Sequence, residues 1–400
     1  MEGTAHRWAS PGELVAYALP PGFHWLEILA AHAQSGASFL PIDVRLSERE
    51  QERLIDRARP SVVVRPGEET VLADAAPIDP ERAWAVVATS GTSGEPRLAQ
   101  LSRAAVGSSV AASLDALGAS AYDAWVACLT PAHIGGLLVL LRGVLTGSPI
   151  TLLERFEPGR LLAEAPSGAH VSLVPTMLER LVRGGADLSG LGEILIGGAR
   201  LDPGLRDAAV RLGGRIMNTY GCTESCGGVV YDGIPFAGTS IRIDAERPNA
   251  PGVVELRGPT LMDGYRHEPA ATAAAFTTDG WLRTGDIGSF GPDGHLRIVG
   301  RADDAIRTGA ETVWPEEVES VVQTHPKVAD VAVAGRPDPE WGAHVVAWVV
   351  PVDPTDPPTL EQIREHCRDG LARFKAPRDL RLLATVPRTV SGKVRRSALP

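Results

Sequence analysis

The sequence predicts an α/β fold: a large N-terminal domain of parallel α/β sheets plus a small β unit, followed by a small mobile α+β C-terminal domain. Short apolar runs alternate with segments of helical periodicity over the first 300 residues. From about residue 239 the pattern changes to short strands separated by turns. The last part, roughly 100 residues, is long enough to form its own core. We therefore expect an N-terminal domain of residues 1–301 and a C-terminal domain of residues 302–400, with the boundary at Ala302.

Periodicity and stop signals identify the elements of the larger domain. The segment WLEILAAHAQSG has apolar residues at helical spacing and ends at Gly36, and a second helical stretch runs from Ser47 to Ala58. Buried strands are expected at FLPI, SVVV, AWAVVATS, AWVACLT, PITLL, HVSLV, EILIG and RIMNTY. Ligands of such parallel sheets bind beyond the carboxyl ends of the strands.

The remaining elements are shorter. TSIRI, VVEL and HLRIV, with the turn signal GPDG, predict a mostly antiparallel β unit. A helix from Pro315 to Thr324, strands at VADVAVAG and HVVAWVV, a Pro-rich break, another helix and a strand then complete the C-terminal domain.

Composition excludes several classes of protein. The net charge of −10 argues against a nucleic-acid binder, and no apolar stretch is long enough to span a bilayer. Four unevenly spaced cysteines argue against a disulfide scaffold. The opening MEGTAHRWASPGE has no signal-peptide pattern. We therefore expect a cytoplasmic enzyme or binding protein without nucleic-acid partners or stable membrane insertion.

Lysine is rare in this chain. Among 39 basic residues only Lys327, Lys375 and Lys393 are lysines, and residues 361–400 carry ten basic and four acidic side chains. The basic tail is either a solvated surface or a face for an anionic ligand. Lys393, in a Ser-Gly-Lys loop, is either a surface lysine or a mobile ammonium that neutralises a phosphate.

Two glycine-rich loops follow expected strands. The loop from Thr89 to Arg97, TSGTSGEPR, has the composition of a phosphate loop without the Walker pattern. The loop from Tyr220 to Glu224, YGCTE, offers an aromatic ring for a nucleobase, a hydroxyl, and a carboxylate suited to Mg²⁺. Taken alone, the first is equally compatible with an ordinary Ser/Gly-rich loop and the second with a capped turn.

Isolated charges suggest further contacts. Asp286 follows a strand, where a carboxylate commonly accepts hydrogen bonds from ribose hydroxyls, and Arg301 could add donors. Taken alone, each of the two motifs is more typical of a turn. Arg142 lies in a helix that is apolar nearly all round, so its charge needs a partner. That partner is a ligand carboxylate, a structural acid, or solvent reached by snorkelling.

Together, in this order, these motifs resemble the adenylate-forming superfamily of acyl-CoA synthetases, peptide-synthetase adenylation domains and luciferases. The resemblance runs from about residue 26 to 399 and includes SGASFLPIDVRLSERE and GVVELRGPTLMDGY. It implies a two-step reaction in which ATP and a carboxylate give an acyl-adenylate and pyrophosphate. A thiol, usually that of coenzyme A, then displaces AMP.

The resemblance also implies residue roles. The implied nucleotide-binding residues are Thr89, Ser90, Gly91, Thr92, Ser93, Gly94, Arg97, Gly198, Tyr220, Gly221, Asp286 and Arg301. The implied catalytic residues are Thr223, Glu224 and Lys393, of which Glu224 would bind Mg²⁺ and Lys393 would bridge the carboxylate and the α-phosphate. Asp303 matches the hinge about which the small domain rotates between half-reactions.

Within the superfamily the chain most resembles the o-succinylbenzoate-CoA ligases of menaquinone biosynthesis. The cues are the segment from His133 to Arg142, SLVPT before Met177, and TESCGGVVYDG. The implied substrate has an aromatic ring and two carboxylates, one of which Arg142 would neutralise. The implied substrate-binding residues are His133, Arg142, Thr176, Ser225 and Gly227. The chain departs from the family at Arg97, where lysine is usual, at Ala310, where a glycine is usual, and at Gly135, where several relatives have a hydroxyl.

We therefore expect a ligase that uses ATP, Mg²⁺ and coenzyme A, has small-molecule partners, and forms either monomers or a homodimer. One alternative is a ligase for another aryl or acyl acid, and a second loads a carrier-protein thiol. A third is a non-catalytic adenylate-binding protein, against which the set of Glu224, Asp286 and Lys393 argues.

Overall fold

The computed structural model describes residues 10–89, 96–245, 247, 250–309, 311–368, 370–388 and 394–400. Contacts divide the chain into two compact units, Met1–Ile241 with Leu256–Leu282, and Arg242–Glu255 with Arg283–Pro400. Most of the small β unit is therefore grouped with the C-terminal residues, although the sequence placed it with residues 1–301. No helix among the described residues is long and apolar enough to cross a membrane.

The first sheet of the first unit has seven strands in the order β16-β6-β5-β2-β1-β3-β4. Its strands are β1 (Leu14–Tyr17), β2 (Ser38–Pro41), β3 (Val62–Arg65), β4 (Glu68–Val71), β5 (Ala85–Ala88), β6 (Leu98–Leu101) and β16 (Gly264–Tyr265). The four central strands pair in parallel, and β4, β6 and β16 add antiparallel edges.

The second sheet also has seven strands, in the order β13-β12-β11-β10-β9-β7-β8. Its strands are β7 (Trp125–Ala127), β8 (Ile150–Leu152), β9 (His170–Leu173), β10 (Glu193–Ile196), β11 (Arg215–Cys222), β12 (Gly227–Tyr231) and β13 (Ile234–Pro235). Strands β7 to β11 are parallel, whereas β12 and β13 are antiparallel to their neighbours. The predicted α/β class is confirmed, with antiparallel strands added at the sheet edges.

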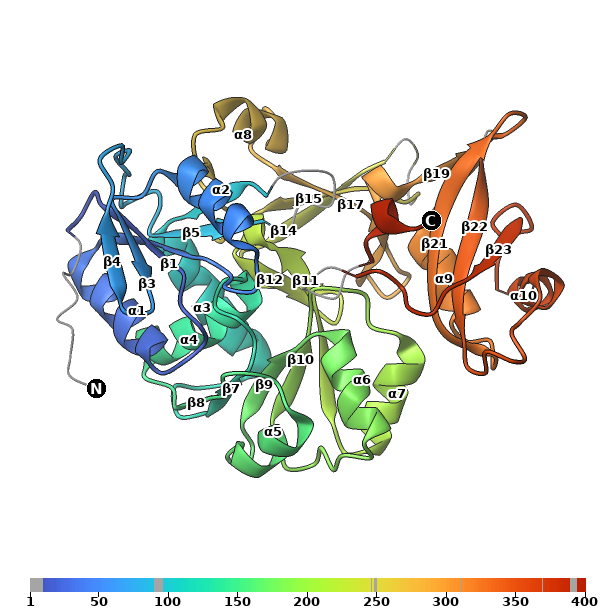
Figure 1. The fold of residues 1–400 in the computed structure, drawn as a ribbon, viewed down its shortest axis with the longest axis horizontal. Helices are drawn as coiled ribbons and strands as arrows, with labels where there is room; N and C mark the ends of the chain where they lie inside the picture. The colour runs from blue at the N-terminus through green and yellow to red at the C-terminus, as the bar shows by residue number, and fades with distance from the viewer. Residues whose placement is uncertain are drawn as a thin grey trace. The chain divides into compact units, whose positions relative to one another are not determined.

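Helices connect the parallel strands, as Figure 1 shows for α6 and α7 beside β10 and β11. The helices of this unit are α1 (His24–Ser35), α2 (Glu48–Ala58), α3 (Arg103–Leu117), α4 (Ile134–Thr146), α5 (Pro158–Glu164), α6 (Pro175–Arg183), α7 (Pro203–Arg211) and α8 (Pro269–Ala275). The expected helix boundaries are confirmed for the first two. Helix α1 ends at Gly36 in the left-handed conformation, and Ser47 and Glu50 form a capping box that begins α2.

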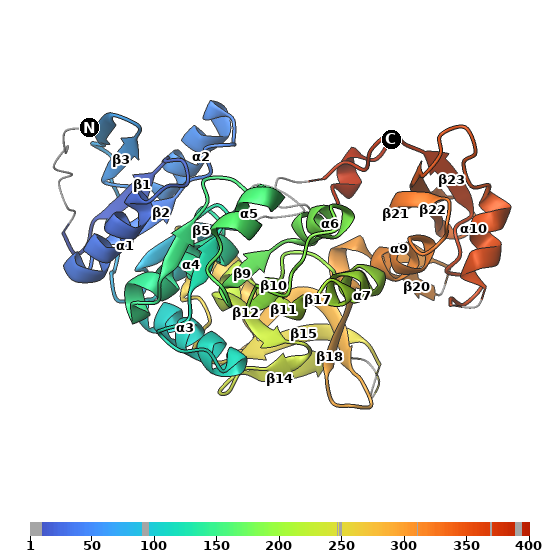
Figure 2. The ribbon, with the colours of Figure 1, turned by 90° about the horizontal axis from the view of Figure 1, so that it is seen from below.

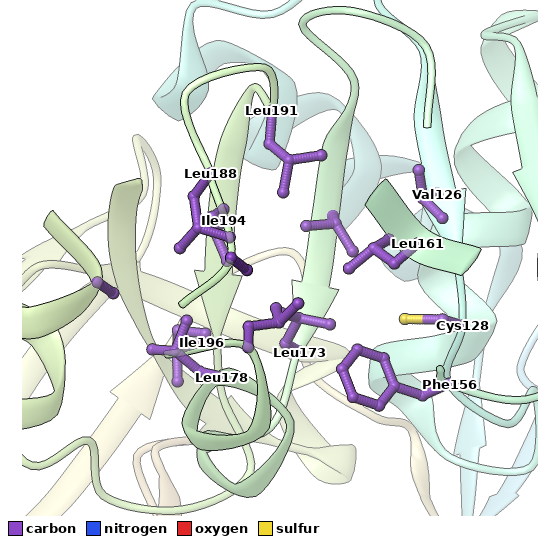
Figure 3. Close-up of a cluster of buried hydrophobic side chains, with 14 of the residues drawn as sticks. Val126, Cys128, Phe156, Leu161, Leu173, Leu178, Leu188, Leu191, Ile194 and Ile196 are labelled. Carbon is purple, nitrogen blue, oxygen red and sulfur yellow. The ribbon is translucent and has the colours of Figure 1, made fainter. Parts of the chain in front are cut away.

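A buried apolar cluster fixes the second sheet against its helices (Figure 3). Leu173 on β9 and Ile194 on β10 are almost fully buried, and they pack with Leu161 of α5 and Leu178 of α6. Protein interiors are packed as densely as organic crystals, so this cluster holds the strands rigidly. The loops at the carboxyl ends of these strands therefore start from fixed positions.

The second unit contains two further sheets. Three strands of the first sheet run across the points at which the chain passes from one unit to the other. The four-stranded sheet β14-β15-β17-β18 consists of β14 (Ser240–Asp244), β15 (Gly252–Arg257), β17 (Leu282–Phe290) and β18 (Leu296–Arg301). The five-stranded sheet consists of β19 (Ile306–Thr308), β20 (Glu311–Val313), β21 (Val328–Asp338), β22 (Gly342–Pro351) and β23 (Asp379–Leu382).

The long hairpin of β21 and β22 is covered on both faces. Helices α9 (Pro315–Val322) and α10 (Leu360–Cys367) pack on one face, and both lie beside the hairpin in Figure 2. Val386 and Leu399, from the C-terminal segment, pack with Trp348 on the other face. Because successive residues of a strand point to opposite faces, the near-continuous apolar sequence of this hairpin suits burial on both sides.

Arg396 ties the C-terminal segment to the rest of the second unit. Its guanidinium lies 2.8 Å from Glu319, 3.1 Å from Glu316 and 3.4 Å from Asp304. Its Nε also donates to the carbonyl of Val333. Three carboxylates thus share one cation that is mostly buried.

A second anchor lies just before this arginine. Arg388 and Val394 form an antiparallel bridge, and the backbone N–H of Arg395 donates to the carbonyl of Pro387 at 2.8 Å. Arg388 also donates to Asp330 on β21 at 2.7 Å. Both ends of the segment that contains Lys393 are therefore attached to the same unit.

The Glu319 carboxyl predicts a pH-dependent contribution to stability. Burial raises its pKa from 4.5 to about 7, although Arg396 lowers it and Glu316 adds to the rise. The folded chain therefore binds this proton more tightly than the unfolded chain, and stability falls as the pH rises from 4.5 to 7. Glu319→Gln should flatten that part of the profile of melting temperature against pH. Glu340→Gln, which alters an exposed carboxylate, is the control, and parallel profiles for all three proteins would contradict the assignment.

Candidate active site

The Ser/Gly-rich loop starts directly after β5, at the carboxyl end of a parallel strand. The N–H of Thr89 donates to the carbonyl of Arg97 at 2.8 Å, and the N–H of Arg97 donates to Thr89 Oγ1 at 3.1 Å. These two hydrogen bonds close the base of the loop. Ser90, Gly91, Thr92, Ser93 and Gly94 lie outside the described residues, so their roles stay predictions.

Glu224 and Arg97 both contact the same tyrosine. The Tyr265 hydroxyl donates to Glu224 Oε1 at 2.8 Å, and the Arg97 guanidinium lies over the Tyr265 ring, 5.2 Å from its centroid. Burial and then the Glu224 charge raise the pKa of the Tyr265 phenol well above its usual range, so that it remains a donor. Arg97 Nε lies 3.6 Å from Glu268, which also accepts a hydrogen bond from Arg57 at 2.7 Å. The structure thus brings a residue of each predicted loop to one point.

Thr223 and Glu224 lie in a short 3₁₀ turn between β11 and β12. The two strands approach so closely that a Cβ on Gly221 would overlap the carbonyl of Gly227. Ser225 is fully buried, where it accepts from the Cys222 N–H and donates to the Gly227 carbonyl, both at 2.9 Å. We expected Ser225 to contact substrate, but its hydroxyl holds this turn together.

Three other predicted residues follow neighbouring parallel strands. His133 precedes α4 after β7, Thr176 lies in the first turn of α6 after β9, and Gly198 follows β10. Because the strands are parallel neighbours, these residues stand at the same edge of the sheet, as does Tyr220 on the extension of β11. The first unit thus brings these residues to one edge of the sheet, and their roles in binding stay predictions.

His133 contacts an acid that the sequence analysis did not single out. Its Nε2 lies 3.5 Å from Oδ2 of Asp43, which follows β2 in the first sheet. Although burial opposes ionisation, hydrogen bonds and the charge of Arg45 hold the pKa of the Asp43 carboxyl below its usual value. Asp43 is therefore an anion at neutral pH, and its charge lies next to the His133 ring.

Arg142 has a different environment from the one expected. It is 3% exposed, donates to Ser113 Oγ at 3.1 Å and 3.2 Å, and stacks over the Trp125 ring at 4.3 Å. Tyr231 and Cys226 lie close enough to interact with its charge. Among the described residues it has no carboxylate within ion-pair distance. The structure therefore buries this cation behind the turn of β11 and β12 and leaves it almost no surface for direct contact with a ligand.

Asp286 and Arg301 face each other in the second unit. They are paired across β17 and β18, and Arg301 donates to Asp286 Oδ1 at 2.9 Å and to the carbonyl of Thr284 at 3.1 Å. Asp303 follows in a 3₁₀ turn and is exposed. The two residues form an ion pair, which the sequence did not predict, and their expected contacts with ribose hydroxyls stay predictions. Lys393 lies outside the described residues, so its role stays a prediction.

Tyr265, Glu268 and Asp43 were not predicted as site residues from the sequence. Tyr265 belongs to the GVVELRGPTLMDGY segment that supports the family resemblance, and this was the one signal available for it. Asp43 likewise belongs to SGASFLPIDVRLSERE, whereas Glu268 lies outside both segments. The contacts of Glu268 and Asp43 join positions far apart in the chain, and no local pattern marks such pairs.

The described part of the chain can supply a carboxylate to Mg²⁺ through Glu224. No group of three or more His, Cys, Asp and Glu side chains is arranged for a metal within the described residues. Mg²⁺ usually binds through one or two carboxylates together with substrate phosphates, so a single carboxylate next to the phosphate loop fits its coordination.

The close approach of the two strands predicts the effect of a minimal substitution. Gly221→Ala should force β11 and β12 apart and lower the free energy of unfolding by about 1–3 kcal/mol, as overpacked sites do. Gly107→Ala is the matched control, because Gly107 lies on helix α3 and a Cβ there meets nothing within 4 Å. Urea denaturation of both variants measures the difference. Equal stability of Gly221→Ala and the wild type would show that the hairpin can relax.

Known proteins resemble this chain over most of its length. A family model described as AMP-binding enzyme matches residues 65–266, and one described as AMP-binding enzyme C-terminal domain matches residues 317–393. A probable 2-succinylbenzoate–CoA ligase of Mycobacterium tuberculosis is 39% identical over 78% of this chain and 83% of its own. An indoleacetate–CoA ligase of Aromatoleum aromaticum is 32% identical over 98% of this chain and 88% of its own.

A solved structure shows the same fold. The o-succinylbenzoate CoA synthetase of Bacillus subtilis, in complex with its acyl-adenylate intermediate, matches with a TM-score of 0.86 at 24% identity. The match covers 98% of this chain and 88% of that one. With both models in the expected order and relatives matched along most of their length, this chain belongs to the AMP-binding enzyme family.

Proposed function

We propose that this chain is an AMP-forming ligase that joins 2-succinylbenzoate to coenzyme A in menaquinone biosynthesis. The observation that carries the proposal is the 39% identity to a relative with that name over 83% of its length. The convergence of Arg97 and Glu224 on Tyr265 supports it, because the cation expected to bind phosphate and the carboxylate expected to bind Mg²⁺ contact one side chain.

The first half-reaction activates the carboxylate. A carboxylate oxygen of the acid attacks the α-phosphorus of ATP, and pyrophosphate leaves with its electron pair. Arg97 and the loop that begins at Thr89 bind the departing phosphates. Glu224 would hold Mg²⁺, which would supply positive charge against the phosphates. Tyr220 stacks on the adenine, Thr223 contacts the α-phosphate, and the ribose hydroxyls bind Asp286, which Arg301 orients.

The second half-reaction forms the thioester. The thiolate of coenzyme A attacks the acyl carbon, and AMP leaves. In this proposal residues 302–400 swivel about Asp303 between the two steps, which removes Lys393 from the first reaction centre. The four free cysteines support an assignment to the cytoplasm, where thiols are kept reduced.

A substrate panel tests the activity. Pyrophosphate release and AMP formation should be fastest with 2-succinylbenzoate, and acyl-CoA should accumulate only with coenzyme A present. Indoleacetate is the second acid to test, because a relative named for it matches nearly the whole chain. Faster turnover of indoleacetate, benzoate or a fatty acid would overturn the substrate assignment.

A substitution at Lys393 separates the two half-reactions. Lys393→Ala should abolish pyrophosphate release and still convert a supplied acyl-adenylate to the thioester. Equal loss of both steps would contradict its role in the first step alone.

Arg142 is proposed to act on the second carboxylate of the substrate through its charge, without contact. An unneutralised cation in a low-dielectric interior exerts a long-range field, because few mobile charges screen it. Arg142→Met removes the charge and keeps most of the volume, and it should raise the KM for 2-succinylbenzoate about tenfold, equivalent to about 1.4 kcal/mol. The KM for benzoate should change little. Arg180→Met, which removes an arginine stacked on Phe156 near the surface, is the control. An equal rise for both acids would assign Arg142 a structural role alone.

A further inference from the structure

Tyr265 occupies a place where three parts of the chain meet. It lies on β16, which pairs with β6 so that Tyr265 is opposite Ala99, two residues after Arg97. Its side chain reaches the turn that contains Glu224. The residue is 8% exposed, so its orientation is determined by packing.

The hydroxyl of Tyr265 lies close enough to interact with both Glu224 and Arg97, and the ring contacts Arg97. The hydroxyl donates to one oxygen of Glu224, which restricts the rotation of that carboxylate. The ring lies beneath the Arg97 guanidinium and stabilises the cation by its quadrupole. Glu268 holds the same guanidinium from its Nε side, and Glu268 is itself paired with Arg57.

We propose that Tyr265 is a positioning residue that sets the metal-binding carboxylate of Glu224 and the phosphate-binding guanidinium of Arg97 relative to each other. This inference rests on the proposed function, because it takes Glu224 as a Mg²⁺ ligand and Arg97 as a phosphate ligand. Tyr265 does not touch the reacting atoms. Its hydroxyl pre-organises the metal ligand, and its ring pre-organises the cation.

Two substitutions separate the hydroxyl from the ring. Tyr265→Phe removes the hydrogen bond to Glu224 and the interaction of the hydroxyl with Arg97, and it keeps the ring below Arg97. Tyr265→Leu removes the ring contact as well. Tyr17→Phe is the matched control, because Tyr17 is also a buried tyrosine of the first unit and its hydroxyl is hydrogen-bonded to His32 at 2.7 Å.

The direct measurement is the calorimetric affinity of the full chain for α,β-methylene-ATP at several Mg²⁺ concentrations, which needs no acid substrate and no turnover. Tyr265→Phe should raise the Mg²⁺ concentration needed for half-maximal affinity by about two- to tenfold, the range expected for one lost hydrogen bond. Its affinity at saturating Mg²⁺ should fall less than that of Tyr265→Leu, because the ring still lies below Arg97. Tyr265→Leu should show the same Mg²⁺ shift and a several-fold weaker affinity at saturating Mg²⁺, because Arg97 is no longer held.

The results separate a failure of the positioning role of Tyr265 from a failure of the proposed function. An unchanged Mg²⁺ dependence in Tyr265→Phe, with Mg²⁺-dependent nucleotide binding intact in the wild type, would overturn the positioning role. An equal shift in Tyr17→Phe would also overturn it, because a general loss of stability would then explain the effect. If the wild type binds the nucleotide without any Mg²⁺ dependence, the proposed metal role of Glu224 fails first.

Discussion

The contact between the backbones of β11 and β12 is the constraint on which the candidate site depends. Gly221 lies so close to Gly227 that no side chain fits between them. The chain must therefore reverse within the few residues of the 3₁₀ turn, and Thr223 and Glu224 project from that turn. The buried hydroxyl of Ser225 satisfies backbone groups that this tight reversal leaves without strand partners.

The charges of the chain illustrate two ways of burying an ion. Asp286 and Arg301 are opposite charges across a strand pair, where each offsets the desolvation of the other. Arg142 instead has hydroxyl and aromatic neighbours. Such neighbours solvate a cation without cancelling its charge, so its field persists in the surrounding interior. A structural ion pair would have removed that field.

Local patterns predicted much of the fold and part of the site. The buried strands from FLPI to RIMNTY, the end of α1 at Gly36 and the start of α2 after Ser47 all follow from short-range propensities, and each is confirmed. Strand β1 was not predicted, although Pro11-Gly12 before it and Pro20-Pro21-Gly22 after it are turn signals that mark its limits. The edge of the second sheet at which His133 and Gly198 stand follows from parallel pairing alone.

The rest depended on contacts between distant residues. Ser225 and Arg142 have residue types that suit ligand binding, and only burial shows that one is committed to a turn and the other to the interior. Tyr265 gains its importance from partners in two separate loops. No periodicity or composition reveals such a convergence, since it arises when two strands become neighbours in the folded sheet.

The contacts on either side of residues 389–393 have a consequence for how the proposed reaction can proceed. The bridge between Arg388 and Val394, the ion pair of Arg388 with Asp330 and that of Arg396 with Glu319 attach both flanks to the second unit. A movement that carries these flanks from one half-reaction to the other must carry that unit with them, unless the bridge and the ion pairs break.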